Sequence, residues 1–242
     1  MVDSADELPS KNQLKLAGER IRKRATGAAL ELDGEQALRD AQLVKRWRSA
    51  HSSALTKTRS GLGTIVMRIL QLDSQTGLVT QRLKRYESIV AKLVRDKPRL
   101  GEIQDIAGCR AVLPGRETVA QVWTALGGSP KLRVEQVRDY NQCPHAGGYR
   151  ALHLWCRRDG FKVEVQLRTA HQQQWAELVE RWDGTLRLDI KHESAPEPVL
   201  KYFRELADFY HQLDNGVADS EADISALRAA TAQVRHWLET EA

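Results

Sequence analysis

The sequence predicts an α/β (α+β) fold in which a mixed β-sheet is flanked by helices, with helical extensions at both ends. Two observations lead to this fold class. Short apolar or alternating segments typical of strands occur between residues 109 and 168. Residues 14–60 and 198–238 instead carry apolar side chains at helical spacing. Helices on both sides of a strand-rich segment argue against an all-helical bundle.

The N-terminal part, residues 1–75, is expected to be helical, with apolar positions at helical spacing such as Leu38, Leu43, Val44 and Trp47. Thr26-Gly27 and Asp33-Gly34 divide it into at least two helices. Gly61-Leu62-Gly63-Thr64 predicts a turn before a short helix over 65–72. These glycines are not followed by Lys and Ser/Thr, so they do not form a phosphate-binding P-loop.

The central part, residues 76–185, is expected to hold the sheet. A helix is predicted over 83–95, then a buried strand over 109–113 that stops at Pro114-Gly115. A short helix over 117–126 and a strand over 134–140 follow.

Two further strands, over 150–157 and 161–168, are joined by Arg158-Asp159-Gly160, and Asp-Gly is a strong hairpin signal. A helix over 169–182 closes the central part. The C-terminal part, residues 186–242, predicts two amphipathic helices over about 198–213 and 221–238. Their apolar faces pack on the chain's own sheet, or form a surface for an antitoxin or a second subunit.

Composition limits the class of protein. The 242 residues are 29% charged, and no run approaches the roughly 18 apolar residues of a membrane span. The acidic N-terminus lacks the apolar core of a secretory signal, and three cysteines without metal-site spacing fit a reducing cytoplasm. The net charge of +5 is concentrated in residues 76–100, where seven Lys/Arg face two acids. Such a run forms a solvated helix face or binds a polyanion.

The predicted strand over 161–168 is the most informative segment. Its apolar residues alternate with Lys162, Glu164, Gln166 and Arg168, which share the opposite face. In one interpretation this polar face lies in water; in the other, Glu164 and Gln166 line a cleft. On the neighbouring strand His153 lies on the face opposite Leu152 and Leu154, so an imidazole and a carboxylate could share one site.

Asp105 precedes the buried strand, where an acid is either a turn residue or a ligand. Two acids on a sheet can bind Mg²⁺, which completes its shell with phosphate oxygens and water. Arg82, Lys84 and Lys92 could provide countercharge for those phosphates. Tyr149 lies in a glycine-containing loop and either stacks on a base or packs at the rim of the core.

Together these segments resemble the RelA/SpoT synthetase family, in the order typical of that family and over roughly residues 80–185. The matching stretches are Arg82-Leu83-Lys84 with Ser88-Ile89 and Lys92; Asp105 to Arg110; Asp139-Tyr140 through Gly148-Tyr149-Arg150 to His153; and Glu164 to Thr169. The resemblance implies a small stand-alone member with a nucleotidyltransferase-like fold. It also implies transfer of the β,γ-pyrophosphate of ATP to a ribose 3′-hydroxyl, with Mg²⁺.

The resemblance also implies residue roles. The ATP-binding positions are Arg82, Lys84, Ser88 and Lys92. Asp105 corresponds to the magnesium-binding acid, and Glu164 to the glutamate that binds metal or activates the acceptor hydroxyl. The acceptor-binding positions are Tyr149, which stacks on the acceptor base, with His153, Gln166 and His145. This arrangement suits phosphoryl-type transfer, which depends mostly on positioning and charge neutralisation.

The departures from the family pattern fall within residues 144–151, of which residues 144–149 are here called the acceptor loop. His145 stands where the family has lysine, Gly147 where it has asparagine, and Ala151 where it has serine. Neutral histidine dominates near pH 7, so a permanent positive charge is lost. An asparagine side chain that could read a guanine edge is lost as well.

These losses favour the 3′-CCA end of tRNA as acceptor, and hence a translation-inhibiting toxin with an antitoxin partner. The alternatives are an alarmone synthetase that uses GDP or GTP, and a catalytically inactive RNA- or nucleotide-binding module. Retention of both Asp105 and Glu164 argues against the inactive module. For tRNA, phosphate contacts outside the cleft are expected from Arg95, Lys97, Arg99, Lys131 and Arg133.

Overall fold

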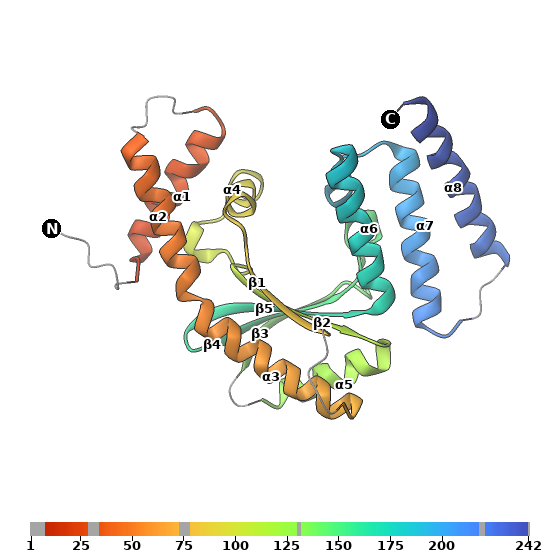
Figure 1. Cartoon of the computed structure of the whole chain (residues 1–242), viewed down its shortest axis with the longest axis horizontal. Coiled ribbons are helices and arrows are strands. Elements are labelled where there is room, and N and C mark those ends of the chain that lie inside the picture. Colours follow the sequence, from red (N-terminus) through yellow and green to blue (C-terminus); the bar gives the residue numbers. More distant parts are fainter. Residues whose placement is uncertain (1–7, 29–33, 73–77, 130–131, 218–220, 242) are drawn as a thin grey trace.

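A mixed five-stranded sheet organises the chain (Figure 1), in a computed structural model that describes residues 8–28, 34–72, 78–129, 132–217 and 221–241. The strand order is β1-β2-β5-β4-β3. β2 and β5 run parallel, whereas the other neighbouring strands are antiparallel. The strands are β1 Val79–Leu83, β2 Ala107–Leu113, β3 Arg133–Asp139, β4 Leu152–Arg158 and β5 Phe161–Thr169. The predicted fold class is therefore confirmed.

Three helices form the N-terminal part: α1 Lys11–Ala25, α2 Gly34–Ala50 and α3 Ser52–Leu70. α1 begins with a capping box between Ser10 and Gln13, and it ends at Thr26, before Gly27 at φ +70°. The predicted break at Thr26-Gly27 is therefore confirmed. The second predicted break is at Asp33-Gly34. Asp33 lies outside the described residues, and α2 begins at Gly34.

The predicted turn at Gly61-Leu62-Gly63-Thr64 is wrong, because these residues lie inside α3. Leu62 and Val66 are buried in the core beneath the sheet, together with Leu55. This apolar stripe stabilises a continuous helix by more than the two glycines weaken it, since each glycine costs only about 1 kcal/mol.

Gly61→Ala is expected to raise the free energy of unfolding by about 0.5–1 kcal/mol. An added Cβ at Gly61 meets no atom within 4 Å, and alanine loses less backbone entropy on folding. Urea unfolding followed by circular dichroism measures the change. Gly148→Ala is the comparison variant, for which the opposite effect is expected. Gly148 has φ +94°, and the new Cβ would lie 2.6 Å from Cβ of Ala207. This variant should therefore be less stable than wild type. Equal effects of the two substitutions would contradict this account.

The helix predicted over 83–95 begins too early, because residues 79–83 form strand β1. The helix itself, α4, spans Tyr86–Arg95. β1 is an edge strand that pairs only with β2, and its middle residues Thr80, Gln81 and Arg82 are exposed. Alternation of apolar and polar residues, the signal used to find strands, is therefore absent from it.

The remaining predicted elements of the sheet region are confirmed. α5 spans Arg116–Gly127, and β4 and β5 form the expected hairpin. Its turn places Asp159 at φ 49° and Gly160 at φ 83°, as a tight Asp-Gly hairpin turn requires. β5 leads directly into α6, Ala170–Leu186, through a capping box between Thr169 and Gln172.

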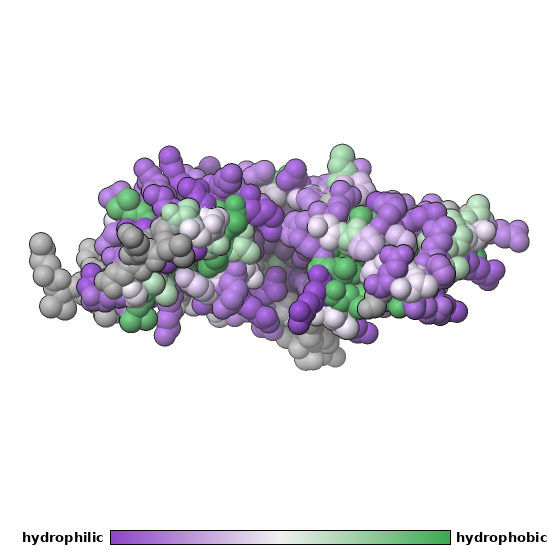
Figure 2. Space-filling view, turned by 90° about the horizontal axis from the view of Figure 1, so that it is seen from above, coloured by the Kyte–Doolittle hydropathy of each residue, from purple (hydrophilic) through white to green (hydrophobic). Residues whose placement is uncertain are grey.

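The two faces of the sheet have different surroundings (Figure 1). α3 and α5 cover one face, where Leu113, Val165 and Leu167 belong to the main apolar core. Above the other face, α1, α2 and α4 stand at one end and α6 to α8 at the other. Seen from above, this side is predominantly hydrophilic and is hollowed between the two groups of helices (Figure 2).

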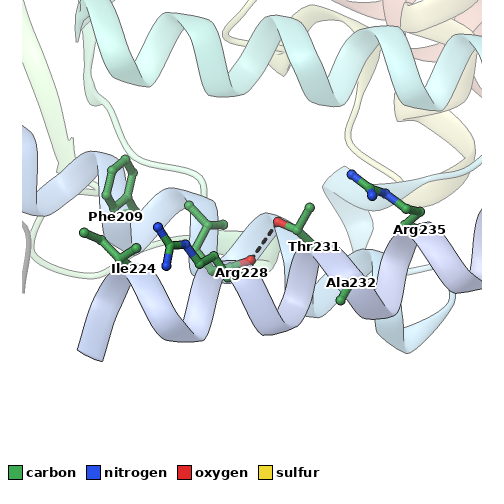
Figure 3. A pocket seen from close by; sticks show the side chains of 7 residues that line it. Phe209, Ile224, Arg228, Thr231, Ala232 and Arg235 are labelled. Atoms are coloured by element: carbon green, nitrogen blue, oxygen red, sulfur yellow. Dashed lines mark hydrogen bonds between the residues drawn. The ribbon is translucent and has the colours of Figure 1, made fainter. Parts of the chain in front are cut away.

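The two C-terminal helices, α7 Glu197–Asp214 and α8 Glu221–Thr240, confirm the predicted helices. They form a layer of their own rather than packing on the sheet: α7 lies against α6, and α8 lies against α7. Trp175, Phe203 and Trp237 are buried between these helices. A groove of about 480 Å³ between α7 and α8 is lined by Phe209, Ile224 and Leu227 together with Arg228 and Arg235 (Figure 3). An antitoxin or a second subunit on this surface stays a prediction.

Other expectations concern the class of protein. Among the described residues, no helix has the length and apolar character needed to cross a membrane. Cys109, Cys143 and Cys156 are all free thiols. Burial raises the pKa of Cys109 and of Cys156 to about 12, so both stay protonated. The division at residues 75 and 185 stays a prediction.

Candidate active site

A cleft of about 700 Å³ lies on the face of the sheet opposite α3 and α5. Its walls come from β1, α4, β2, β4, β5 and α6, and from the turn that follows α6. Side chains predicted independently from four segments of the sequence meet in it: Arg82, Lys84, Ser88, Lys92, Arg95, Asp105, His145, Tyr149, His153, Glu164 and Gln166. The structure thus brings together both the predicted donor positions and the predicted acceptor positions.

Asp105 is the centre of the donor side. Lys84 Nζ lies 2.9 Å from its Oδ2 and Lys92 Nζ lies 3.0 Å from its Oδ1. Burial by itself raises the pKa of Asp105, but attraction to the two ammonium groups outweighs burial and holds the pKa below its ordinary value. Asp105 is therefore ionised at neutral pH, and both lysines are held at the cleft.

Helix α2 positions Lys84, a role that the sequence does not reveal. Lys84 follows β1 directly, and its backbone N–H donates to the carbonyl of Ile106 at 2.8 Å. Arg48, on α2, donates from Nε to the carbonyl of Lys84 at 2.7 Å. Because Arg48 and Lys84 are 36 residues apart, only the tertiary structure shows that α2 holds the Lys84 backbone.

Glu164 is the centre of the acceptor side. Its Oε1 lies 2.9 Å from Nδ1 of His153, and its Oε2 accepts from Nε2 of Gln166 at 2.7 Å. Burial raises the pKa of Glu164, but the hydrogen bond and the charge interaction with His153 outweigh it, so the pKa is lowered. The polar face of β5 therefore lines a cleft, the second of the two interpretations above.

Tyr149 lines the cleft but is largely enclosed, with 7% of its surface exposed. Its hydroxyl lies 2.6 Å from Nε2 of His153 and accepts from Nη2 of Arg168 at 2.7 Å. The Arg168 guanidinium lies over the ring, 5.0 Å from its centroid, and Tyr140 packs edge-on at 5.6 Å. In this arrangement the ring is part of the rim of the core, and its stacking on an acceptor base stays a prediction that requires the ring to become accessible.

Tyr149→Phe is expected to lower the free energy of unfolding by about 1–3 kcal/mol, because His153 and Arg168 each lose a buried partner. Tyr202→Phe is the control, since the Tyr202 hydroxyl has no hydrogen bond within the described part of the chain. Thermal unfolding of both variants measures the difference. Equal stability of the two variants would show that the hydroxyl network contributes nothing.

Arg110 and Arg168 are cleft residues that the sequence reasoning did not assign to a role. Both donate to Oε1 of Gln173 at 3.2 Å, yet the Nε of each is buried without a hydrogen-bond partner. Burial, followed by repulsion from Arg168 and Arg82, lowers the pKa of Arg110. Cations packed this closely suit a polyanionic ligand. The strand alternation could have revealed them, since Arg110 and Arg168 both lie on the face opposite the apolar residues of their strands.

The residues expected to contact RNA do not lie together. Arg95 lines the cleft and pairs with Asp96, while Lys97 and Arg99 follow the end of α4. Arg133 begins β3, at the opposite edge of the sheet from β1. Lys131 lies outside the described residues. Their contact with tRNA stays a prediction.

The donor set of the cleft fits magnesium. Asp105 and Glu164 are both ionised and line the same cleft. Repulsion between the two carboxylates raises the pKa of Glu164, but less than the groups that lower it. Among the described residues no group of three or more His, Cys, Asp or Glu could hold a metal by itself. Two acids suit Mg²⁺, which binds through one or two carboxylates and substrate phosphates rather than an all-protein cage.

The sheet and its cleft define an α/β protein equipped to bind a phosphorylated ligand. The model of the region found in RelA/SpoT proteins matches residues 81–183, from β1 to α6. GTP pyrophosphokinase YwaC of Bacillus subtilis is 33% identical over 147 residues, which cover 55% of this chain and 68% of that protein. The chain belongs to the RelA/SpoT family.

Other relatives extend the comparison. An uncharacterized protein of Mycobacterium tuberculosis is 37% identical over 126 residues, half of this chain, and the chain spans 44% of that relative's length. The crystal structure of small alarmone synthetase 2 from Bacillus subtilis has a TM-score of 0.61 at 29% identity, covering 71% of this chain and 94% of that one. Small alarmone synthetase 1 from the same organism, bound to pppGpp, has a TM-score of 0.62 at 23% identity, covering 76% and 96%. The fold is that of the small alarmone synthetases.

Proposed function

We propose that the protein is an ATP-dependent pyrophosphokinase that transfers the β,γ-pyrophosphate of ATP to the ribose 3′-hydroxyl of a guanosine nucleotide. The observation behind the proposal is that two ionised acids, Asp105 and Glu164, line the same basic cleft. Asp105 is held by Lys84 and Lys92, and Glu164 is held by His153 and Gln166. Such a site offers both a place for polyphosphate and a base for a hydroxyl.

The residues have distinct roles in this reaction. Arg82, Lys84 and Lys92 bind the triphosphate of ATP, and Glu164 accepts the proton of the acceptor 3′-hydroxyl. The 3′ oxygen forms a bond to the β-phosphorus, while the bond from that phosphorus to the oxygen bridging it to the α-phosphorus breaks and AMP leaves with that oxygen. Mg²⁺ bound by Asp105 and Glu164 would neutralise phosphate charge. Because a carboxylate oxygen can only accept a hydrogen bond, Nδ1 of His153 carries the proton that fixes Glu164 in place.

Two observations favour a guanosine nucleotide as acceptor. Two of the relatives named above are a GTP pyrophosphokinase and a synthetase bound to pppGpp. The cleft also contains more cations than the donor cluster needs, since Arg110, Arg168 and Lys191 line it as well. A nucleoside 5′-diphosphate or triphosphate would neutralise that surplus charge.

The second candidate acceptor is the 3′-CCA end of tRNA, in which case the protein would be a translation-inhibiting toxin with an antitoxin. The altered acceptor loop favours it, because His145 and Gly147 lack the cation and the amide that would select a guanosine nucleotide. A 3′-terminal adenosine carries no 5′-polyphosphate, so this candidate leaves the surplus cations of the cleft without a ligand.

Incubation with ATP labelled at the γ-phosphate and Mg²⁺, in the presence of GDP, GTP, AMP or deacylated tRNA, tests the proposal. Label on GDP or GTP supports it. Label on tRNA alone overturns the guanosine acceptor and favours the toxin. Label on none of the four overturns the activity and favours the inactive binding module, which equilibrium binding of the same ligands would then characterise.

A further inference from the structure

The connection between α6 and α7 (residues 187–196, here called the α6–α7 turn) forms one wall of the cleft. It lies beyond residues 81–183, the region matched to RelA/SpoT proteins. The turn is firmly held: Ile190 is completely buried, and its N–H donates to Oδ1 of Asp183 at 2.8 Å. Asp189 and Ser194 close it through paired backbone hydrogen bonds of 3.3 and 3.0 Å.

The α6–α7 turn docks directly on the acceptor loop. The N–H of Gly147 donates to Oε1 of Glu193 at 3.3 Å. Gly147 has φ +69°, and an added Cβ would lie 3.2 Å from the carbonyl oxygen of Ile190. A side chain at this position would therefore be strained and crowded. Glycine in place of the asparagine typical of the family permits this close approach.

The docked turn brings Lys191 into the cleft. Its ammonium group has no hydrogen bond or ion pair among the residues that the structure describes. The cleft walls withdraw water from the ammonium group and lower the pKa of Lys191, although the residue as a whole is exposed. Attraction to Glu180 opposes this shift, whereas repulsion from Arg168, Arg82 and Arg110 adds to it. A cation without an ion pair, with three arginines and one carboxylate around it, is an arrangement that an anionic ligand would stabilise.

The acceptor loop itself lacks such a cation. His145 lines the same cleft, next to the α6–α7 turn. Burial, followed by repulsion from Arg138 and His192, lowers the pKa of His145 below its ordinary value of 6.5. The imidazole is therefore neutral at pH 7 and cannot replace a lysine as a permanent charge.

We propose that Lys191 supplies the phosphate-binding cation that the acceptor loop lacks at His145, so that the α6–α7 turn binds the 5′-phosphates of the acceptor nucleotide. This inference rests on the proposed function. It accounts for two departures from the family pattern together: Gly147 permits the close approach of the turn, and Lys191 on the turn replaces the lost lysine. The same residue could instead contact the phosphates of ATP, and kinetics separate the two sources.

Lys191→Ala is expected to raise the KM for GDP or GTP by roughly 10- to 100-fold, the loss of one charge-assisted phosphate contact. The KM for ATP should change less than about twofold, and Lys191→Arg should recover most of the affinity for the acceptor. Lys201→Ala, on α7 and outside the cleft residues, is the matched control. An unchanged acceptor KM, or a rise in the KM for ATP alone, overturns the inference.

A second experiment tests whether a lysine at position 145 can take over the role of Lys191. His145→Lys, introduced into the Lys191→Ala protein, should restore at least half of the lost acceptor affinity, because it returns the cation to the acceptor loop. If the acceptor KM of the double variant stays as high as that of Lys191→Ala, Lys191 does not replace the cation that the acceptor loop lacks at His145. Failure of the proposed function is recognised separately, because the wild-type protein would then transfer label to none of the acceptors and titration calorimetry would detect no binding of GDP.

Discussion

Glu164→Gln is expected to reduce kcat for pyrophosphate transfer by roughly 10²–10⁴-fold while leaving the fold intact. The substitution keeps the shape of the side chain and an oxygen that can accept from Nδ1 of His153. It removes the negative charge that would receive the proton of the 3′-hydroxyl and face the metal ion. Single-turnover kinetics at saturating ATP measure the loss, and circular dichroism checks the fold.

The pH dependence follows from the same hydrogen bonds. The pKa of Glu164 lies below its ordinary value of 4.5 in the folded protein. A general base is active when deprotonated, so protonation of Glu164 lowers the rate only as the pH falls below that ordinary value. If activity is instead lost on acidification while the pH is still above 4.5, a group other than Glu164 is titrating.

Glu135→Gln is the matched control for Glu164→Gln. Glu135 is a strand residue too, but it lies on β3, outside the cleft residues, and pairs with Arg157 at 2.7 Å. It should keep transfer within about twofold of wild type, since partly exposed ion pairs contribute little. A large loss in this variant as well would show that the assay reports general destabilisation rather than chemistry.

Local sequence signals predicted much of the site. Alternation along β5 placed Glu164 and Gln166 on one face, and the Asp-Gly turn fixed β4 beside it. His153 is paired with Gln166 in the sheet, so it lies within reach of Glu164. Strand geometry alone therefore brings the imidazole and the carboxylate together, which explains why the prediction succeeded without knowledge of the rest of the fold.

What the sequence did not reveal depends on contacts between distant segments. Arg48 holds the backbone of Lys84, and Lys191 enters the cleft because its turn docks on Gly147. Neither contact has a periodic signal. The burial of Tyr149 has the same origin, since Arg168 and Trp175 enclose it. Local periodicity predicts the faces of strands and helices, whereas the packing of one element on another decides which side chains are accessible.

Asp105→Asn is the second change expected to have a large effect, reducing pyrophosphate transfer by at least about 100-fold. The substitution removes the proposed ligand for Mg²⁺ and the charge that holds Lys84 and Lys92, the proposed phosphate-binding lysines, in the cleft. Lys84 and Lys92, which lie 2.9 and 3.0 Å from the carboxylate, then repel each other without a counterion. The apparent KM for ATP should therefore rise as well.

Stability provides an independent readout at Asp105. Its pKa is lowered from the ordinary 3.8 in the folded protein, so the ionised carboxylate stabilises the fold above that value. This contribution is lost as the pH falls through the lowered pKa. The free energy of unfolding of Asp105→Asn should consequently lie furthest below that of wild type at neutral pH, and the gap should narrow in acid.

Asp159→Asn serves as the control for Asp105→Asn, because Asp159 also pairs with a lysine, Lys57, at 2.6 Å, but both side chains are about half exposed and lie outside the cleft residues. Solvent screens such a pair, so neither transfer nor stability should change measurably. Urea unfolding of the three proteins at neutral and acidic pH, combined with transfer rates under Mg²⁺, checks both effects. Wild-type turnover in Asp105→Asn would remove Asp105 from the metal site, whereas a stability gap that does not change with pH would show that its ion pairs with Lys84 and Lys92 do not stabilise the fold.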